Sequence, residues 1–493
     1  MRQIITRLEG KVTGVRVRFA PSPTGFLHVG GLRTALYNFL FARRAAGAFI
    51  LRIEDTDRSR LVEGAVANLI EALRWAGLSY DEGPGKGGDR GPYVQSERLT
   101  LYREHARILV EKGAAYHAFD TPEELERMRK EQERLRLPLK YDRRALDLDP
   151  GEVGRRLASG TPSVVRLRVP EGRRLVLDDL VRGRVEFSSD LLDDQVLLKS
   201  DGFPTYHLAN VVDDRLMGVS HVIRGEEWLS STPKHLLLYE SFGWEAPTFA
   251  HLPLLLNPDK SKLSKRQGDV AVEDYRARGY LPEALVNFVA LLGWNPGDER
   301  EIFSLDDLVR EFDLDRVGKA GAVFNVEKLD WLNFQHLRRR GDDDVLAMLR
   351  RHLQADFPRW PHPEDQTLRA IVRAMRDRVT FIRDFTEKGG YLFHPPGSFD
   401  QEAVRKRWTG ETPDRLRALA DAFDRLAAPG TEEFEGALRR TAELLGIGTG
   451  DLIHPLRLAV SGVGGGPGLY DILAILGREE TVRRIHSAIE AIS

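Results

Sequence analysis

The sequence predicts an α/β protein with a parallel sheet near its N-terminus and a helical C-terminal region. The first observation is the segment 15–53. Its apolar residues alternate over Val15–Phe19, recur three and four apart over 32–40, and run together over 49–53. Strand, helix and strand in this order form the unit of a parallel sheet. The second observation is the segment 341–493, which has helical periodicity and no run of alternating strands.

The turn between the first strand and helix is suited to binding phosphate. Pro21 and Pro23 end the strand, and Gly30 and Gly31 open the helix. Small residues let a nucleotide approach the backbone, and a helix N-terminus attracts phosphate oxygens. His28 can donate a hydrogen bond to a phosphate. By itself this turn is weak evidence for a nucleotide site.

Composition excludes several classes of protein. The chain has 493 residues, which is enough for about two to four domains. A net charge of −2 confines any nucleic-acid surface to local patches. The absence of cysteine excludes disulfides, thiolate zinc sites and a cysteine nucleophile. There is no apolar run of about 20 residues and no signal segment, so we expect a soluble cytoplasmic protein.

Periodicity and turn residues predict further elements along the chain. Thr121 and Pro122 are an N-cap and a first helical residue, and they open a charged helix over 125–137. Further helices are expected at 62–76, 101–112, 282–292, 305–312, 368–385, 414–426 and 434–445. Strands are expected at 163–169, as two short strands within 175–187, and at 249–256. Loops are expected at 80–92 and at a basic hinge, 336–340.

Two basic segments have alternative interpretations. Arginines and lysines between 127 and 144 could contact phosphates, but interleaved glutamates make a solvated, salt-bridged helix about as probable. Lys262–Arg266 reads KLSKR, a loop suited to neutralising a triphosphate leaving group. A five-residue basic loop is ordinarily just surface.

Several strings together resemble the class I aminoacyl-tRNA synthetases. APSPTGFLHVGG, residues 20–31, is similar to their HIGH signature, with Val29 for Ile and Gly31 for the final His. Arg18 and the RIEDTD string at 52–57 are similar to the glutamyl/glutaminyl branch. KLSKR resembles the KMSKS loop. The helical C-terminal region is typical of bacterial-type glutamyl-tRNA synthetases, whereas glutaminyl enzymes carry β-barrels there.

The resemblance implies a fold with six parts. It implies a split Rossmann-like catalytic domain with an inserted α/β acceptor-binding domain, followed by helical stem-contact and all-α anticodon-binding domains. The expected boundaries are 1–98 and 206–258 for the two catalytic halves, 99–205 for the insert, 259–340 for the KMSKS and stem-contact part, and 341–410 and 411–493 for the anticodon part.

The resemblance also implies a ligase reaction in two steps. The α-carboxylate of L-glutamate attacks the α-phosphorus of ATP, giving glutamyl-adenylate and pyrophosphate. A terminal ribose hydroxyl of tRNA-Glu then takes the glutamyl group and releases AMP. Neither step needs a protein nucleophile, so positioning and charge stabilisation supply the catalysis. We expect ATP with Mg²⁺, no zinc, no membrane and a monomer.

Site residues follow from the matched positions. The catalytic residues are expected to be His28, Gly30, Lys262 and Lys265. ATP is expected to contact His28, Gly30, Gly31, Glu227, Leu255, Lys262, Ser264, Lys265 and Arg266. Glutamate is expected to contact Arg18, Ala20, Ser22, Glu54, Tyr206, Asn210 and Arg224. Either arginine could read the γ-carboxylate, and Arg376 and Arg378 are candidates for reading an anticodon base.

Two other classes of function stay open at this point. The chain could adenylate another small acid without tRNA, which the helical C-terminal region disfavours. It could be a non-catalytic RNA-binding paralogue, which the two intact signature strings disfavour. The sequence also leaves open whether tRNA-Gln is charged and whether adenylate formation needs bound tRNA.

Overall fold

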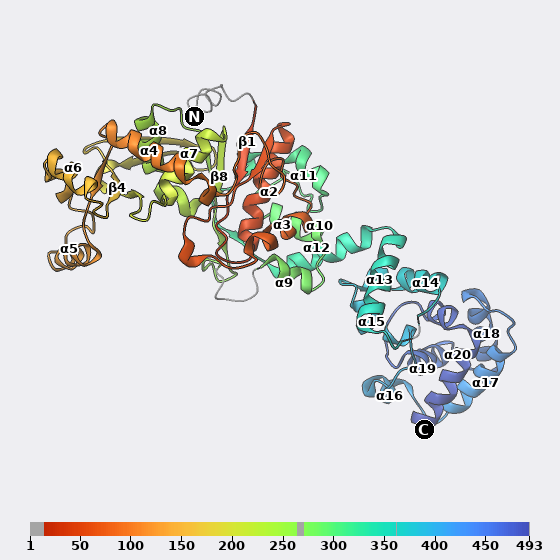
Figure 1. Cartoon of the computed structure of the whole chain (residues 1–493). Coiled ribbons are helices and arrows are strands. Elements are labelled where there is room, and N and C mark those ends of the chain that lie inside the picture. The colour runs from red at the N-terminus through yellow and green to blue at the C-terminus, as the bar shows by residue number, and fades with distance from the viewer. Residues whose placement is uncertain (1–13, 264–270, 361, 493) are drawn as a thin grey trace. The chain divides into compact units, whose positions relative to one another are not determined.

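The computed structural model describes residues 14–263, 271–360 and 362–492, which belong to two compact units (Figure 1). The N-terminal unit comprises Met1–Arg278 and Pro282–Val326. The C-terminal unit comprises Gly279–Leu281 and Glu327–Ser493. Within the described residues, no helix has the length and apolar character needed to cross a membrane.

The N-terminal unit mixes short strands with helices. Its strands are β1 (Arg16–Phe19), β2 (Ala48–Leu51), β3 (Ala115–Ala118), β4 (Val164–Leu167), β5 (Arg174–Asp179), β6 (Gly183–Ser188), β7 (Val196–Leu198), β8 (His221–Gly225), β9 (Thr248–Leu252), β10 (Leu255–Leu256) and β11 (Ala322–Val323). Its helices are α2 (Val29–Arg44), α3 (Ala65–Trp75), α4 (Leu99–Glu111), α5 (Pro122–Arg134), α6 (Pro150–Ala158), α7 (Tyr206–Leu216), α8 (Thr232–Phe242), α9 (Val272–Ala277), α10 (Pro282–Ala290) and α11 (Leu305–Glu311).

Parallel strands at the centre confirm the predicted strand, helix and strand unit. Strand β1 pairs with β2, and β8 pairs with β9, both in parallel. Ser220, which precedes β8, exchanges hydrogen bonds with Arg16 of β1, so the two pairs lie side by side. Helix α2 packs on these strands through buried apolar residues, and Asn38 donates to the Ile223 carbonyl at 3.1 Å. The C-terminal ends of β1 and β8 therefore face the same region.

The predicted insert contributes to this central sheet. Strands β5 and β6 form an antiparallel hairpin, and β5 pairs with β9 where Asp179 lies opposite Phe249. The rest of the insert has its own antiparallel sheet in the order β3-β4-β7. The hairpin therefore places residues of the insert beside β9.

Helix α5 shows why the predicted elements of this region were reliable. Thr121 accepts a hydrogen bond from the Glu124 backbone, and the Glu124 side chain accepts one from the Thr121 backbone at 2.8 Å. Pro122 occupies the first helical position. The helix is therefore specified by four consecutive residues, independently of distant contacts.

The C-terminal unit is helical. Its helices are α12 (Val326–Arg339), α13 (Asp342–Asp356), α14 (Asp365–Met375), α15 (Asp384–Glu387), α16 (Gln401–Arg407), α17 (Thr412–Asp424), α18 (Thr431–Leu445), α19 (Gly450–Ser461) and α20 (Leu469–Ile492). Helix α20 is interrupted at Gly477, whose φ of 77° is outside the helical region. Apolar side chains such as Leu416, Phe434 and Leu456 are fully buried between these helices.

Three predicted elements were wrong in detail. The helix expected at 368–385 ends at Met375, because Asp384 accepts hydrogen bonds from the backbones of Thr380 and Phe381 and holds that segment in a turn. The strand expected at 249–256 divides into β9 and β10 around Pro253, which has no backbone donor. The basic hinge expected at 336–340 mostly forms the last turn of α12, where positive charge is favourable.

Candidate active site

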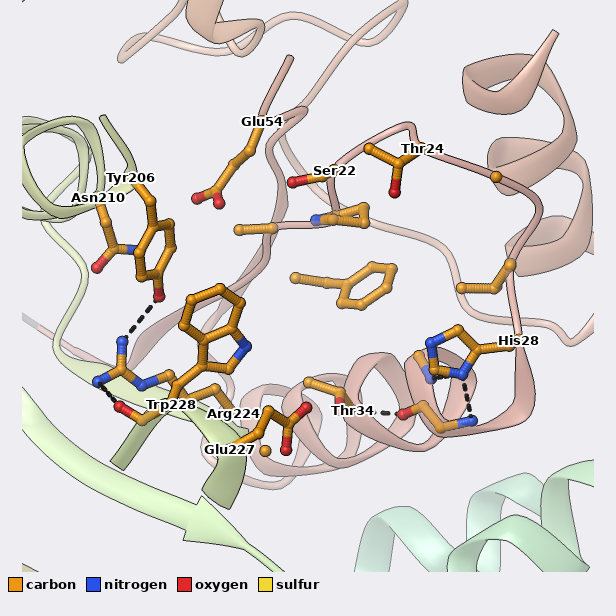
Figure 2. A pocket seen from close by; sticks show the side chains of 18 of the residues that line it. Ser22, Thr24, His28, Thr34, Glu54, Tyr206, Asn210, Arg224, Glu227 and Trp228 are labelled. Carbon is orange, nitrogen blue, oxygen red and sulfur yellow. Dashed lines mark hydrogen bonds between the residues drawn. The ribbon is translucent and has the colours of Figure 1, made fainter. Parts of the chain in front are cut away.

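A cavity of about 890 Å³ opens at the C-terminal ends of β1 and β8. All of the catalytic, ATP-binding and glutamate-binding residues predicted from the sequence that the structure describes line this cavity. They are Arg18, Ala20, Ser22, His28, Gly30, Gly31, Glu54, Tyr206, Asn210, Arg224, Glu227, Leu255 and Lys262. Ser264, Lys265 and Arg266 lie outside the described residues. Figure 2 shows His28 on one side of the cavity, with Arg224, Tyr206 and Asn210 on the other.

His28 is the N-cap of α2. Its Nδ1 atom accepts hydrogen bonds from the backbones of Gly30 at 3.1 Å and Gly31 at 3.2 Å (Figure 2). An accepting Nδ1 carries no proton, so the neutral ring has its proton on Nε2 and can donate only from that atom. A side chain at Gly30 would start 2.9 Å from the His28 ring. This glycine therefore makes room for the imidazole, a reason that the sequence did not reveal.

The side of the cavity near His28 holds residues from four segments. Lys262 is exposed beside β10, and its backbone pairs with Leu256. The Leu255 side chain lies near Gly30, and its carbonyl accepts a hydrogen bond from Leu263 at 2.9 Å. Glu227 is exposed and folds back against Gly225, where a Cβ atom would collide with its carboxylate. A cation, an anion and a helix N-terminus thus face one cavity.

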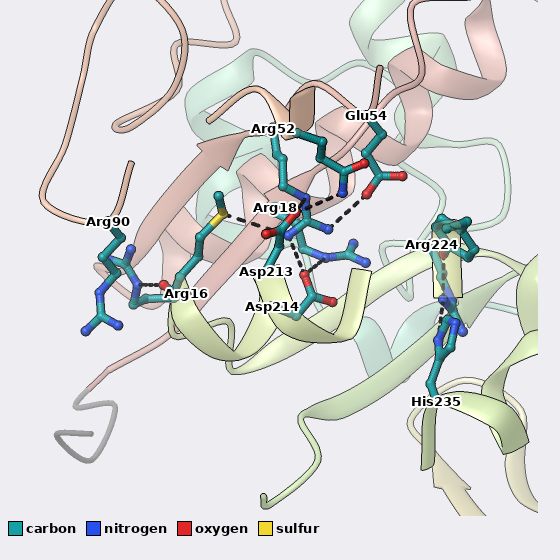
Figure 3. Close-up of polar contacts among 12 residues, drawn as sticks. Arg16, Arg18, Arg52, Glu54, Arg90, Asp213, Asp214, Arg224 and His235 are labelled. Atoms are coloured by element: carbon teal, nitrogen blue, oxygen red, sulfur yellow. Dashed lines mark hydrogen bonds and ion pairs between the residues drawn. The ribbon is translucent and has the colours of Figure 1, made fainter. Parts of the chain in front are cut away.

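Behind the other side lies a buried, charge-balanced group that we call the Arg52 cluster (Figure 3). Its members are three arginines and three carboxylates, each less than a tenth exposed: Arg18, Arg52, Arg98, Glu54, Asp213 and Asp214. Asp214 Oδ1 accepts from Arg18 Nε at 3.0 Å and from Arg52 Nη1 at 2.7 Å. Arg52 Nη2 donates to Glu54 Oε1 at 3.0 Å, and Arg98 Nε donates to Asp213 at 2.7 Å.

The environment separates the pKa values of two carboxylates of this cluster, Asp214 and Glu54, of which Glu54 lines the cavity. Burial would raise the pKa of Asp214, but the charges of Arg18 and Arg52 outweigh it and lower that pKa. Burial raises the pKa of Glu54, and Arg52 and Arg18 offset this only in part. Of these two carboxylates, Glu54 therefore gains more from a cation that enters the cavity.

Arg224 has a different environment, which we call the Arg224 cluster: Tyr206, Arg224, Thr232, His235 and His251. Arg224 is 4% exposed. It donates from Nη1 to the Tyr206 hydroxyl at 2.8 Å, from Nη2 to Thr232 at 2.8 Å, and from Nε to His251 Nε2 at 3.0 Å. Figure 3 shows His235 beside it, with Nδ1 at 3.3 Å from Nη1. Among the described residues, no carboxylate forms an ion pair with Arg224.

The histidines of the Arg224 cluster are neutral. Burial and the nearby Arg224 charge hold the pKa of His235 well below its usual range. Burial also lowers the pKa of His251, although its hydrogen bond to Asp179 opposes the shift. A buried guanidinium among neutral groups favours an anion from outside the chain, because uncompensated buried charge is costly. Arg224 is thus better suited than Arg18 to bind a carboxylate.

Two further predictions concern metal ligands and the residues that read the anticodon. In the described part of the chain, no group of three or more His, Cys, Asp or Glu residues is arranged to hold a metal ion. In the C-terminal unit, Arg376 pairs with Asp342 at 3.2 Å and donates to the Arg340 carbonyl at 2.7 Å. Arg378 is exposed. Of the two, Arg378 has the more accessible guanidinium.

Sequence reasoning missed the residues that support the site from behind. Asp213 and Asp214 carried a usable signal, because two adjacent acids directly after the apolar pair Val211 and Val212 are expected to need cationic partners when that helix face is buried. His251 also carried one, as a polar residue inside an apolar strand. The sequence around Asp179 contains no signal that distinguishes this residue from an exposed acid in a hairpin turn.

Comparison with known proteins defines the class. Residues 14–331 match the catalytic domain of class I tRNA synthetases (E and Q), and residues 344–489 match an anticodon binding domain. The chain belongs to the class I tRNA synthetases of this E and Q family. The family predicted from the sequence strings is confirmed.

Individual relatives narrow the comparison. The chain is 52% identical over 491 residues to a glutamate–tRNA ligase of Chloroherpeton thalassium, covering 97% of this chain and 98% of the relative. It is 51% identical to the glutamate–tRNA ligase of Chlorobium luteolum over 494 residues, with the same coverage. The crystal structure of a glutamate tRNA ligase from Elizabethkingia meningosepticum in complex with its amino acid superposes with a TM-score of 0.93 at 42% identity, covering 97% of this chain and all of that one. The predicted fold class is confirmed.

Proposed function

We propose that the chain attaches L-glutamate to the 3′ end of tRNA-Glu through a glutamyl-adenylate, with release of AMP and pyrophosphate. The observation that carries this proposal is Arg224, a buried guanidinium that lines the cavity and has no carboxylate partner among the described residues. A side-chain carboxylate of the substrate supplies that partner. The similarity to glutamate–tRNA ligases supports the same conclusion.

The amino acid is held by groups of complementary charge. Glu54 accepts the α-ammonium, since its raised pKa makes a nearby cation favourable. The α-carboxylate must face ATP on the His28 side, so the side chain extends toward Arg224 and Tyr206 on the opposite side (Figure 2). Arg18 has its Nε atom fixed by Asp214 and faces the cavity with the rest of its guanidinium. Ala20, Ser22 and Asn210 also line the cavity.

The orientation of glutamate also explains its selection over glutamine. The neutral amide of glutamine would leave the Arg224 charge unmatched in a buried site. Sites that depend on such a buried polar contact reject analogues strongly, by about 10⁴-fold or more. Arg224, rather than Arg18, is therefore the arginine that we assign to the γ-carboxylate.

The nucleotide is held at the N-terminus of α2. His28 donates from Nε2 to a phosphate, and Gly30 and Gly31 border the path of the triphosphate. Lys262, followed in the sequence by Ser264, Lys265 and Arg266, neutralises charge that develops on pyrophosphate. Glu227 and Leu255 border the nucleoside. Mg²⁺ enters with ATP and takes its ligands from phosphates and water, as this ion prefers.

The other parts of the chain have tRNA as their partner. We assign the acceptor end to residues 99–205 and the anticodon to the helices that follow residue 340, with Arg378 and Arg376 as base-reading candidates. The match of residues 344–489 to an anticodon binding domain supports the second assignment. A monomer in the cytoplasm stays a prediction.

Aminoacylation with a panel of amino acids and two tRNAs tests this function. We expect labelled glutamate to be attached to tRNA-Glu with ATP and Mg²⁺, and glutamine and aspartate to be inactive. Adenylate formation without any tRNA charging would indicate a tRNA-independent adenylating enzyme instead. Binding of tRNA without glutamate-dependent pyrophosphate exchange would indicate a non-catalytic RNA-binding protein. Robust product with tRNA-Gln would exclude strict tRNA discrimination.

A further inference from the structure

A line of buried hydrogen bonds runs from the predicted insert to the glutamate site. Asp179, the last residue of β5, accepts from His251 Nδ1 at 2.6 Å. The opposite nitrogen of this ring, Nε2, accepts from Arg224 Nε at 3.0 Å. Arg224 then reaches the Tyr206 hydroxyl at 2.8 Å, at the wall of the cavity. Asp179, His251 and Arg224 are all less than a tenth exposed.

We propose that Asp179 and His251 are positioning residues for glutamate recognition, with Asp179 fixing the tautomer of His251 that holds Arg224 toward the substrate carboxylate. This inference rests on the proposed function, because it concerns the same carboxylate. Neither residue lines the cavity, and neither touches the substrate.

The hydrogen bonds of Asp179 allow only one position for the proton on the His251 ring. Its Oδ1 atom accepts from three backbone N–H groups, those of Val181 at 3.0 Å, Arg182 at 2.8 Å and His251 at 3.1 Å. Its Oδ2 atom is left for the His251 ring. A carboxylate only accepts, so Nδ1 must carry the ring proton and Nε2 must be the bare acceptor.

That bare acceptor is what Arg224 requires. The Nε atom of an arginine can only donate, so a protonated Nε2 at 3.0 Å would place two donors against each other. Thr232 Oγ1 lies 3.2 Å from the same Nε2 and adds a second contact. Burial lowers the pKa of His251, which keeps the ring neutral and the tautomer well defined.

Replacement of Asp179 by asparagine inverts this arrangement with little change in volume. The three backbone donors hold the amide oxygen, so the amide nitrogen of Asp179→Asn faces His251 Nδ1. The ring proton must then move to Nε2 and oppose Arg224. We expect the KM for glutamate to rise by about tenfold or more, which corresponds to one lost hydrogen bond to a charged group. The KM for ATP and the kcat at saturating glutamate stay within about twofold of the native values, the scatter expected of sites that are not in contact.

His251→Gln tests the same idea from the other side. A glutamine oxygen can replace Nε2 as the acceptor for Arg224, and an amide has no tautomer to be fixed. His251→Gln therefore raises the KM for glutamate only a few-fold, on the order of one perturbed neutral contact. In the double variant, Asp179→Asn adds no further increase. A full tenfold increase from Asp179→Asn in the His251→Gln background would contradict the proposed route through the ring.

Asp194→Asn is the matched control. Asp194 is 2% exposed and lies in the same predicted insert, where it accepts from Tyr116 and Arg143 and contacts no member of the Arg224 cluster. We expect its loss to lower the melting temperature without a selective change in the KM for glutamate. Equal increases in the KM for glutamate and ATP in Asp179→Asn would indicate general damage and overturn the proposal.

If Asp179→Asn is poorly stable, a spectroscopic measurement on the native whole chain can still test which nitrogen of His251 carries the proton. Long-range proton–nitrogen spectra of ¹⁵N-histidine-labelled protein report which ring nitrogen carries the proton, and His251→Gln assigns the signal. We expect protonated Nδ1 in the native chain, and a protonated Nε2 there overturns the proposal. If the native chain charges no glutamate, the proposed function itself fails. If it charges glutamate and Asp179→Asn leaves its KM unchanged, only this inference fails.

Discussion

The two buried arginine clusters around the cavity neutralise their charge in different ways. In the Arg52 cluster, three guanidinium groups meet three carboxylates, and Asp214 serves Arg18 and Arg52 together. In the Arg224 cluster, the guanidinium meets a hydroxyl, a phenol and two neutral imidazoles. The first cluster has equal numbers of positive and negative groups without a ligand, whereas in the second the proposed substrate carboxylate supplies the counter-charge. The same cavity is therefore bordered by arginines whose charge is neutralised within the chain and by an arginine whose charge is left for the substrate.

Asp214→Asn is expected to have the largest effect on stability. It leaves Arg18 and Arg52 short of a shared anion, and breaking a buried ion pair costs about 3–5 kcal/mol. Urea unfolding of the N-terminal unit in the whole chain measures this. Because the folded-state pKa of Asp214 is lowered, its contribution is present above the unfolded pKa and is lost as the pH falls through the folded pKa. The difference between the variant and the native chain should therefore shrink in acid.

Arg224→Met is expected to separate activity from stability. The kcat/KM for glutamate should fall by about 30-fold to several thousand-fold, as when one partner of a buried charge pair is truncated. The free energy of unfolding should fall less than in Asp214→Asn, because no opposite charge is left unpaired. A larger loss of stability in Arg224→Met than in Asp214→Asn would contradict the distinction between the clusters.

Glu54→Gln is expected to weaken glutamate binding by about 1.5–3 kcal/mol, the range for a hydrogen bond to a charged group. Titration calorimetry or the KM for glutamate measures this, with the KM for ATP as the control. Burial raises the pKa of Glu54, so the folded state favours the protonated acid. As the pH rises from about 4.3, the unfolded value, to the higher folded pKa, the native chain should lose stability relative to Glu54→Gln. A gain of stability over this pH range would mean that the arginine charges outweigh the effect of burial on the pKa of Glu54.

His28 variants are expected to have the smallest effect on stability. His28→Ala removes the cap of α2 and should cost about 1 kcal/mol. His28→Asn keeps an acceptor for Gly30 and Gly31 and should retain most of that free energy. Both variants should lose aminoacylation rate, since neither has the imidazole donor. Full activity in His28→Asn would remove His28 Nε2 from the proposed ATP contacts.

The sequence predicted the features that are encoded locally. Thr121, Pro122 and Glu124 specify the start of α5 without distant help. The string at 20–31 places His28 at the start of α2 for the same reason. The described site residues that the strings named all line one cavity.

The features that the sequence did not reveal depend on where individual side chains form contacts, which apolar periodicity does not encode. His251 meets Asp179 across 72 positions and Arg224 across 27, and no periodicity links these residues. Apolar spacing over 368–385 suggested one helix, but Asp384 captures two backbone donors and ends it. The role of Gly30 also required the His28 ring to be placed first.

The long-range strand pairing has a consequence for how the chain is made. Arg16 of β1 forms a hydrogen bond with Ser220, 204 positions later, and β5 pairs with β9, which comes much later in the chain. A ribosome releases both early strands before β8 and β9 are synthesised, and contacts of such separation form slowly. Until β8 and β9 emerge, β1 and β5 present unpaired backbone edges that other chains can join. Nascent chains halted before residue 220 are therefore the form of this protein most dependent on protection from aggregation.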